Sequence, residues 1–261
     1  MQYDEISYGK AVKENGFQGD NLTKDLVILS KYLCHIDGLK PKAHKDFVYD
    51  FCKKNIYDFN EVKHYKTIDS CIRKGRDKHC YPIRIKSIPI YEEILKKIDS
   101  YDVADDYKKV MLSMYLDRII TKEKKSQRLR CGQDLNLCYY GNNKTNKLVY
   151  NSSRIGSTYK IKNVLRDLNK NGVIHDVGRN RIILKFAENI NDEKIFHNLQ
   201  SCDFDKVGWL WDLYKKKNNI IRCKDCDVMV RIKLRSKTTR CSVCQYIEDN
   251  KNKRKWDKNN K

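Results

Sequence analysis

The chain has 261 residues, and its 55 Lys and Arg outnumber its 34 Asp and Glu, which gives a net charge of +21. Hydrophobic residues make up 40% of the sequence, enough to form a folded core, so disorder over the whole length is excluded. The longest aliphatic run is Leu26–Leu29, far short of the roughly 20 residues of a membrane-spanning helix. With no apolar leader at the N-terminus, we expect a soluble cytoplasmic protein without a membrane partner.

The positive charge rises along the chain. Residues 1–100 carry a net charge of +4, residues 101–200 carry +8, and residues 201–261 carry +9. A surface that binds a polyanion is therefore expected in the last two thirds. The alternative is a generally lysine-rich composition that reflects AT-rich coding.

The first part of the chain predicts short helices, and we assign residues 1–89 to a helical N-terminal domain. Apolar spacing predicts helices over residues 24–34, with Thr23 as the N-cap, over 42–54, and from about Asn60 to Gly75. Alternation over residues 83–88 suggests a strand or a linker. Two further helices are expected in residues 90–122, and residues 131–149 read as irregular.

A middle domain, residues 90–200, carries the pattern of a winged helix-turn-helix. Ser157 is a good N-cap for a helix with one apolar face, and Gly172 suits its C-terminal stop. Two short strands around the turn 176–180 follow, so the order resembles a recognition helix and its wing. The helix over 105–120 would be the first helix of this domain. The segment before Ser157 leaves room for barely one turn of the helix that should precede it.

The polar face of that helix and the tip of the hairpin predict contacts with nucleic acid, with double-stranded DNA as the favoured partner. Lysine and arginine suit phosphates, while an amide and a guanidinium suit base edges. The alternative is an ordinary solvated face. The candidate residues are Tyr159, Lys162, Asn163, Arg166 and Lys170 on the helix, with Arg179 and Arg181 at the tip.

Four cysteines predict a metal site in the C-terminal domain, residues 201–261. They are spaced Cys223-x2-Cys226-x14-Cys241-x2-Cys244, which is typical of two knuckles that share one Zn²⁺ in a β zinc ribbon. Four thiolates leave no position for water, so the zinc would be structural. Asp227 stands where such knuckles often have glycine. Disulfide pairing or a redox role is the alternative, and the other seven cysteines are expected to be packing residues.

Basic side chains in and after the predicted ribbon suggest contacts with phosphates rather than with bases. The alternative is a solvated tail on a ribbon that caps the fold or binds a protein. The candidates are Arg231, Lys233, Arg235 and Lys237 in the ribbon, with Lys251 and Arg254 in the tail.

No established catalytic motif is found in the sequence, so we expect a protein that is not an enzyme. A nuclease assembled from Asp102, Asp105 and Asp106 is a weak alternative, because their spacing gives no support for a Mg²⁺ site.

Three stretches carry a resemblance to known proteins: Asp25–Leu33 (DLVILSKYL), Val164–Ile174 (VLRDLNKNGVI), and the paired Cys-x-x-Cys motifs with their basic tail. The chain resembles a group of uncharacterised proteins from phages and integrated elements of low-GC Gram-positive bacteria, over most of its length. The resemblance implies a factor that acts in the cytoplasm of a bacterial host. Our leading hypothesis is a DNA-binding protein for the regulation or replication of such an element. The alternatives are an RNA-binding protein, or an adaptor or inhibitor of a host nucleic-acid machine such as a polymerase or a defence complex.

Overall fold

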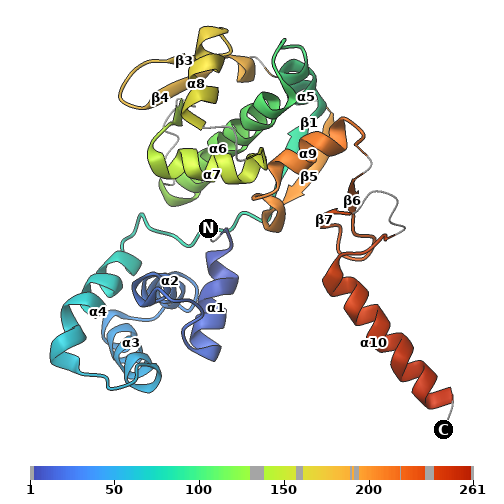
Figure 1. Ribbon diagram of the computed structural model, residues 1–261. Helices are drawn as coiled ribbons and strands as arrows, with labels where there is room; N and C mark the ends of the chain where they lie inside the picture. The colour runs from blue at the N-terminus through green and yellow to red at the C-terminus, as the bar shows by residue number, and fades with distance from the viewer. Residues whose placement is uncertain are drawn as a thin grey trace. The chain divides into compact units, whose positions relative to one another are not determined.

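The computed structural model describes residues 3–129, 138–156, 161–188, 190, 194–217, 219–232 and 238–259. The protein is mainly helical with small antiparallel sheets, which confirms the predicted mainly α (α+β) class (Figure 1). The chain divides into two compact units. Unit 1 comprises Met1–Lys86 and Ile120–Leu135, and unit 2 comprises Ser87–Ile119 and Asn136–Lys261.

Unit 1 is built from α1 (Glu5–Asn15), α2 (Leu22–His35), α3 (Pro41–Asn55) and α4 (Glu61–Gly75). Each helix contributes apolar side chains to one shared core, which includes Val12, Leu29, Leu33, Val48 and Ile68. Because burial of such side chains is the main favourable term in folding, this core explains why short, lysine-rich helices are stable here.

Side-chain caps determine where α2 and α4 begin, and one glycine allows these two helices to approach closely. Helix α4 begins near Asn60 as predicted, with Asn60 as its N-cap, and α2 is capped by Asn21, whose side chain accepts a hydrogen bond from the backbone N–H of Lys24. The predicted cap at Thr23 is wrong, because an asparagine two residues earlier starts the helix first. A Cβ at Gly75 would lie 2.2 Å from Cβ of Ser30, so only glycine allows this close approach.

The longest helix, α6 (Asp105–Leu129), contributes to both units. Its first half is a core helix of unit 2, with Val110, Met111 and Met114 fully buried. Its second half belongs to unit 1, where Gln127 hydrogen-bonds both backbone groups of Arg84.

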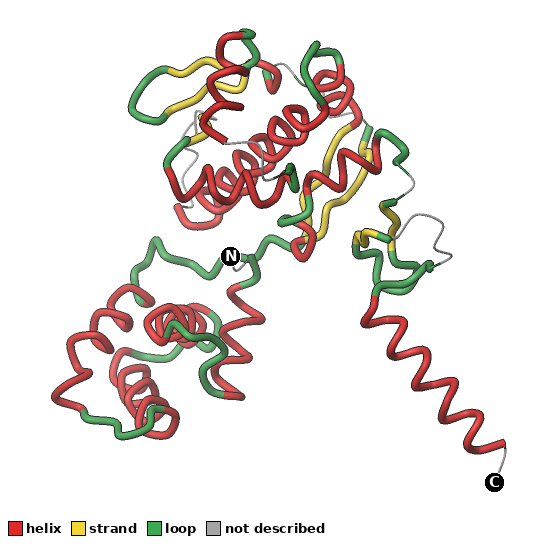
Figure 2. The backbone as a smooth tube through the Cα atoms, in the orientation of Figure 1, coloured by secondary structure: helices red, strands yellow, loops and turns green. Residues whose placement is uncertain are grey.

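The described residues of unit 2 form three small antiparallel sheets. Figure 2 shows their strands in yellow. Strand β1 (Ser87–Tyr91), which precedes α5 (Glu92–Asp99), pairs with β5 (Ile195–Gln200). A second sheet has the order β2-β4-β3, from β2 (Cys138–Tyr140), β4 (Arg181–Leu184) and β3 (Ile174–Asp176), with Ile182 opposite Tyr139 on one side and Asp176 on the other.

Two helices separate β2 from β3. They are α7 (Asn143–Ser153) and α8 (Ile161–Lys170). The irregular region predicted for residues 131–149 is therefore wrong at β2 and from Asn143 onward. An 11-residue helix, α7, stands where the sequence suggested barely one turn. Asn142 caps α7 by accepting a hydrogen bond from the backbone N–H of Thr145.

The C-terminal part of unit 2 begins with α9 (Val207–Tyr214), which packs against α7. A Cβ at Gly208 would lie 1.8 Å from the carbonyl oxygen of Ser153, so glycine is required at this contact. A small hairpin of β6 (Ile220–Arg222) and β7 (Met229–Arg231) follows, and then α10 (Ser242–Asn259). Among the described residues, no helix has the length and apolar character needed to cross a bilayer.

Candidate metal centre and nucleic-acid interface

The first Cys-x-x-Cys pair lies in the tight turn that joins β6 to β7. The backbone N–H of Cys223 donates to the carbonyl of Val228 at 3.0 Å, and that of Asp227 donates to the carbonyl of Cys223 at 2.8 Å. Asp227 has a φ of 56°, in the left-handed region that favours glycine. Asp is one of the few other residues that adopt this conformation readily, which explains why the turn forms without the expected glycine.

The second pair lies at the start of α10. Ser242 begins the helix directly after Cys241, and the backbone N–H of Cys244 donates a hydrogen bond to Sγ of Cys241 at 3.4 Å. The helix therefore holds the second pair of thiols at a fixed spacing, as the hairpin turn does for the first.

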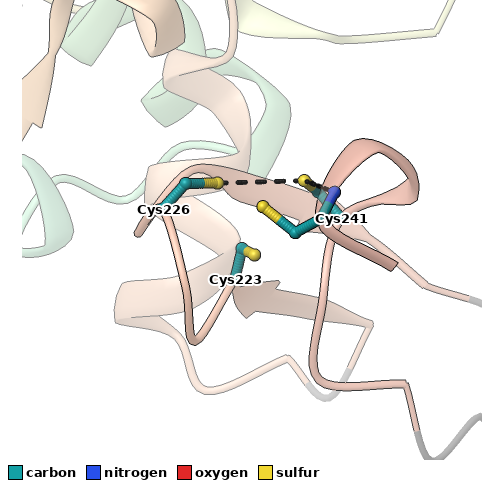
Figure 3. Close-up of side chains that lie close together, drawn as sticks. Cys223, Cys226 and Cys241 are labelled. Carbon is teal, nitrogen blue, oxygen red and sulfur yellow. Dashed lines mark hydrogen bonds between the residues drawn. The ribbon is translucent and has the colours of Figure 1, made fainter. Parts of the chain in front are cut away.

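The four Sγ atoms of Cys223, Cys226, Cys241 and Cys244 all lie within 4.8 Å of one another, so they could hold a metal ion. Figure 3 shows the thiols of the labelled cysteines directed toward one another. The Sγ atoms of Cys226 and Cys241 are 3.8 Å apart. Four Zn–S bonds of about 2.3 Å in a tetrahedron place sulfur atoms about 3.8 Å apart, so this arrangement fits a tetrahedral ion.

The pKa values of the cysteine thiols are shifted in different directions. Hydrogen bonds, the largest from the backbone of Cys241, lower the pKa of Cys223 to about 6 despite an opposing contribution from desolvation. Hydrogen bonds with Cys241 and Cys226 raise the pKa of Cys244. The thiolate form of Cys223 is therefore favoured, whereas a metal ion must displace the proton of Cys244 as it binds.

A buried carboxylate ties the hairpin to the rest of unit 2. Asp203, in the short 3₁₀ helix Ser201–Asp203, is fully buried and accepts hydrogen bonds from Nζ of Lys206 at 2.7 Å and from the backbone N–H of Met229 at 3.1 Å. His197 in β5 is also buried; desolvation, followed by the charge of Arg222 in β6, lowers its pKa.

The remaining cysteines differ in their environments. Cys52 and Cys71 are buried, and desolvation raises the pKa of both, which confirms them as packing residues. Cys202 is exposed, so its predicted packing role is wrong. The described side chains provide no other metal-ligating cluster.

The candidate helix α8 has the two faces predicted for it. Val164 and Leu168 are buried, whereas the polar residues are exposed, as required for contact with a partner. Tyr159 lies outside the described residues. The exposed candidates are Lys162, Asn163, Arg166 and Lys170.

One carboxylate lies beside the candidate guanidinium. Nε of Arg166 is 3.7 Å from Oδ1 of Asp167, while Oδ2 of Asp167 accepts a hydrogen bond from the hydroxyl of Tyr107 at 2.9 Å. The Arg166 side chain nevertheless remains 63% exposed. Ion pairs this open to water are weak, so the guanidinium remains available to a phosphate or a base.

The hairpin turn after α8 presents two arginines. Arg179 and Arg181 are exposed as predicted, and Arg179 and Asn180 both have positive φ, of 52° and 61°. The backbone N–H of Val177 donates to the carbonyl of Arg181 at 3.0 Å, and the backbone N–H of Gly141 donates to the carbonyl of Asn180 at 2.7 Å. These bonds fix the turn to the sheet and to the start of α7.

A groove of about 390 Å³ lies between α8, the β2-β4-β3 sheet and the start of α7, which are adjacent in Figure 1. We call it the α8 groove. Its lining combines cations, amides and apolar side chains, including Asn143, Lys162, Leu165, Arg166, Asn180 and Ile182.

Sequence reasoning missed α7, and with it two exposed lysines. Lys144 and Lys147 lie on its first two turns, close in sequence to the groove residue Asn143. The available signal was Asn142 as an N-cap, followed by the buried spacing of Asn146, Val149 and Ser153. Because two of these three buried residues are polar, apolar periodicity could not reveal this helix.

Of the four ribbon cations predicted to contact phosphates, the structure describes one. Arg231 is exposed. Lys233, Arg235 and Lys237 lie outside the described residues. Lys251 and Arg254 lie on α10, but their side chains are not among those described. Two other ribbon arginines form ion pairs: Arg222 with Asp227 at 3.9 Å, and Arg240 with Asp225 at 2.6 Å.

The acidic residues considered for a nuclease have other partners. Oδ2 of Asp105 is 3.1 Å from Nζ of Lys217, and Asp106 is 3.5 Å from Nζ of Lys109. Burial acts to raise the pKa of Asp105, but the hydrogen bond and charge of Lys217, together with Trp211 and Lys215, outweigh it and the pKa is lowered. Asp102 is exposed. Asp105 therefore joins α6 to the segment that follows α9, whereas the pair of Asp106 and Lys109 lies within α6.

Comparison with known proteins gives no match to a protein-family model, to a curated protein or to a solved structure. The resemblance to phage proteins therefore stays a prediction from the sequence, and the function rests on the site geometry.

Proposed function

We propose that the protein binds nucleic acid, with double-stranded DNA as its partner, through the exposed face of α8 and the adjacent hairpin turn. The observation that carries the proposal is the presence of Lys162, Arg166 and Lys170 on the exposed side of one short helix beside Arg179 and Arg181. A helix of this width fits the major groove, where lysine and arginine contact phosphates and an arginine can read guanine.

The order of elements supports this proposal. Helix α6, strand β2, helices α7 and α8, and strands β3 and β4 follow one another in the order of a winged helix-turn-helix domain, with the sheet order β2-β4-β3. In that arrangement α8 is the recognition helix and the β3–β4 turn is the wing. Helix α7 supplies the element that was missing from the sequence-based assignment.

The metal would be one structural Zn²⁺. Four thiols suit zinc, and a closed coordination shell has no position for a substrate. Zinc would hold the two knuckles together, so the ribbon would present Arg231 and the basic end of α10 to phosphates. The role in regulation or replication of a phage or mobile element rests on the sequence resemblance.

The proposal is tested by fluorescence anisotropy with a labelled random-sequence DNA duplex at several salt concentrations. Binding should weaken steeply with salt, and Arg166→Ala should weaken it more than Arg73→Ala, an exposed arginine on α4 that serves as the matched control. Selection from random duplexes with both variants then measures sequence preference, which Arg166→Ala should reduce. Absence of salt-dependent binding to any duplex would refute the proposal.

A protein partner is the second candidate, and one observation favours it. Val243, Tyr246 and Ile247 lie on the first turns of α10 and are 65%, 68% and 48% exposed. Apolar residues at this spacing form one face, which is typical of helix docking. Affinity purification discriminates the candidates, because a stoichiometric protein lost on Tyr246→Ser would identify this class and nucleic acid would identify the first.

A further inference from the structure

We propose that the α8 groove binds one nucleotide, that is, a phosphate joined through a sugar to a planar base. The inference deepens the proposed function, because Lys162 and Arg166 border the groove and also belong to the proposed DNA-binding face. Its volume of about 390 Å³ lies within the range of small-molecule sites, about 300–1,000 Å³.

The apolar part of the lining suits the face of a base. Ile174 and Ile182 are 2% and 6% exposed, so they form a fixed floor in the sheet, and Leu165 extends this surface from α8. A planar ring laid over this floor covers the apolar surface of the half-buried Leu165 without requiring a polar group to be buried unpaired.

The polar part of the lining suits the edges of a base and a phosphate. Asn143, Asn169 and Asn180 line the groove from α7, α8 and the turn. The Oδ1 atom of Asn169 accepts a hydrogen bond from the backbone N–H of Asp176 at 3.1 Å, which fixes this side chain and leaves its NH₂ group as a donor. An amide can donate and accept at once, as the edge of a base requires.

The charges of the lining favour an anion. Lys162 forms no ion pair within the described part of the chain, and Arg166 is paired only with its neighbour Asp167, at 3.7 Å. The carboxylate in the lining, Asp176, accepts a hydrogen bond from the backbone N–H of Gly178 at 2.8 Å. Two cations on one helix, one turn apart, therefore lie where a phosphate would meet them.

Such a ligand has two sources. It can be a free mononucleotide, which would occupy Lys162 and Arg166 and so compete with DNA, or it can be an unpaired nucleotide of a bound strand. Both present the same phosphate, sugar and base to the groove, and the experiment separates them.

The test uses the full chain, with isothermal titration by 5′-AMP and, separately, by adenosine and by inorganic phosphate. We expect 5′-AMP to bind at least about tenfold more tightly than either part, because only the whole nucleotide reaches both the floor and the cations. In parallel, a labelled hexamer of single-stranded deoxyadenosine tests the second source. The groove is confirmed by either ligand if the blocking variant below weakens its binding.

Asn143→Trp is the blocking variant, because its side chain is exposed at the rim of the groove. Asn151→Trp, also exposed on α7 but outside the lining, is the matched control. We expect at least about a tenfold loss of binding for the first and no change for the second. Asn180→Gly, which suits the positive φ of 61°, removes an amide without strain and serves if Asn143→Trp fails to fold.

The proposal is overturned if neither 5′-AMP nor the hexamer binds, or if the two tryptophan variants bind alike. Duplex binding is measured on the same proteins. Retained 5′-AMP binding with no duplex binding would refute the proposed function alone, and duplex binding with an indifferent groove would refute this inference alone.

Discussion

The cations around α8 and the cations of the C-terminal region are used differently. Among described residues, Lys162, Lys170, Arg179 and Arg181 form no ion pair. In the described part of residues 201–261, by contrast, five basic side chains pair with carboxylates, and most of these pairs join separate elements. They are Lys206, Lys215, Lys217, Arg222 and Arg240.

This difference changes what the net charge means. Residues 201–261 have the highest density of positive charge in the sequence, with a net +9, but part of this charge holds the fold together. The region with the lower net density presents its cations to solvent. A count of charges therefore locates a basic region, whereas the pairing of each cation determines whether a polyanion can use it.

The largest expected effect comes from the metal centre, because the ribbon is expected to depend on a metal ion for its fold whereas α8 is not. Cys226→Ser removes one of four ligands, so bound zinc should fall from about one ion per chain to none, and the ribbon should unfold with the loss of on the order of 10 kcal/mol of metal-coupled folding energy. Metal analysis and hydrogen exchange measure both. Cys202→Ser, an exposed cysteine outside the cluster, should leave both unchanged. A metal-free wild-type ribbon that remains folded would contradict the prediction.

The next effect tests whether C-terminal charges are structural. Asp203→Ala leaves Lys206 without its partner in a buried site and frees the N–H of Met229, so the free energy of unfolding should fall by about 3–5 kcal/mol. Asp205→Ala breaks the more exposed pair with Arg154 and should cost about 0–1 kcal/mol. Urea denaturation of the full chain compares the two variants. Equal losses of unfolding free energy would show that the buried Asp203 contributes no more than an exposed ion pair.

A smaller effect contrasts one arginine from each region. Arg166→Ala should weaken duplex binding by about 1–3 kcal/mol, and each lost phosphate contact should reduce the slope of log affinity against log salt by about 0.9. Arg240→Ala should change duplex binding less, because this arginine is 2.6 Å from Asp225 and its side chain is only 19% exposed. Anisotropy titrations at several salt concentrations measure both quantities. Equal losses of affinity would remove the distinction between the regions.

The smallest expected effect is a dependence of stability on pH that arises from His197 in β5. Burial and Arg222 lower the pKa of His197, so between its native pKa and the ordinary value near 6.5 the unfolded chain binds more protons. The free energy of unfolding should therefore fall as the pH drops below about 6.5. Denaturation at pH 7.5 and pH 5 should show a smaller difference for His197→Gln than for the wild type. An unchanged difference would contradict the assignment.

The sequence predicted those features that depend on local spacing. The Cys-x-x-Cys pairs alone placed four thiols in one cluster, and the spacing of Val164 and Leu168 with Gly172 predicted α8 and its C-terminal end. Helix α7 escaped prediction because its buried face includes Asn146 and Ser153. The partners of charged residues escaped it for another reason, since pairs such as Asp105 and Lys217 are distant in sequence and form only when elements pack.

The division of α6 between the two units also determines when unit 1 can finish folding during translation. The first segment of unit 1 ends at Lys86 and its second segment begins at Ile120. The four N-terminal helices therefore emerge from the ribosome before the second segment, which contains Lys124 and Gln127. At about 5–20 residues per second, the intervening residues take roughly 2–7 s to translate. During that interval Tyr3 and Arg84 lack their contacts with α6. The fold of unit 1 can therefore be completed only after the first segment of unit 2, Ser87–Ile119, has been synthesised.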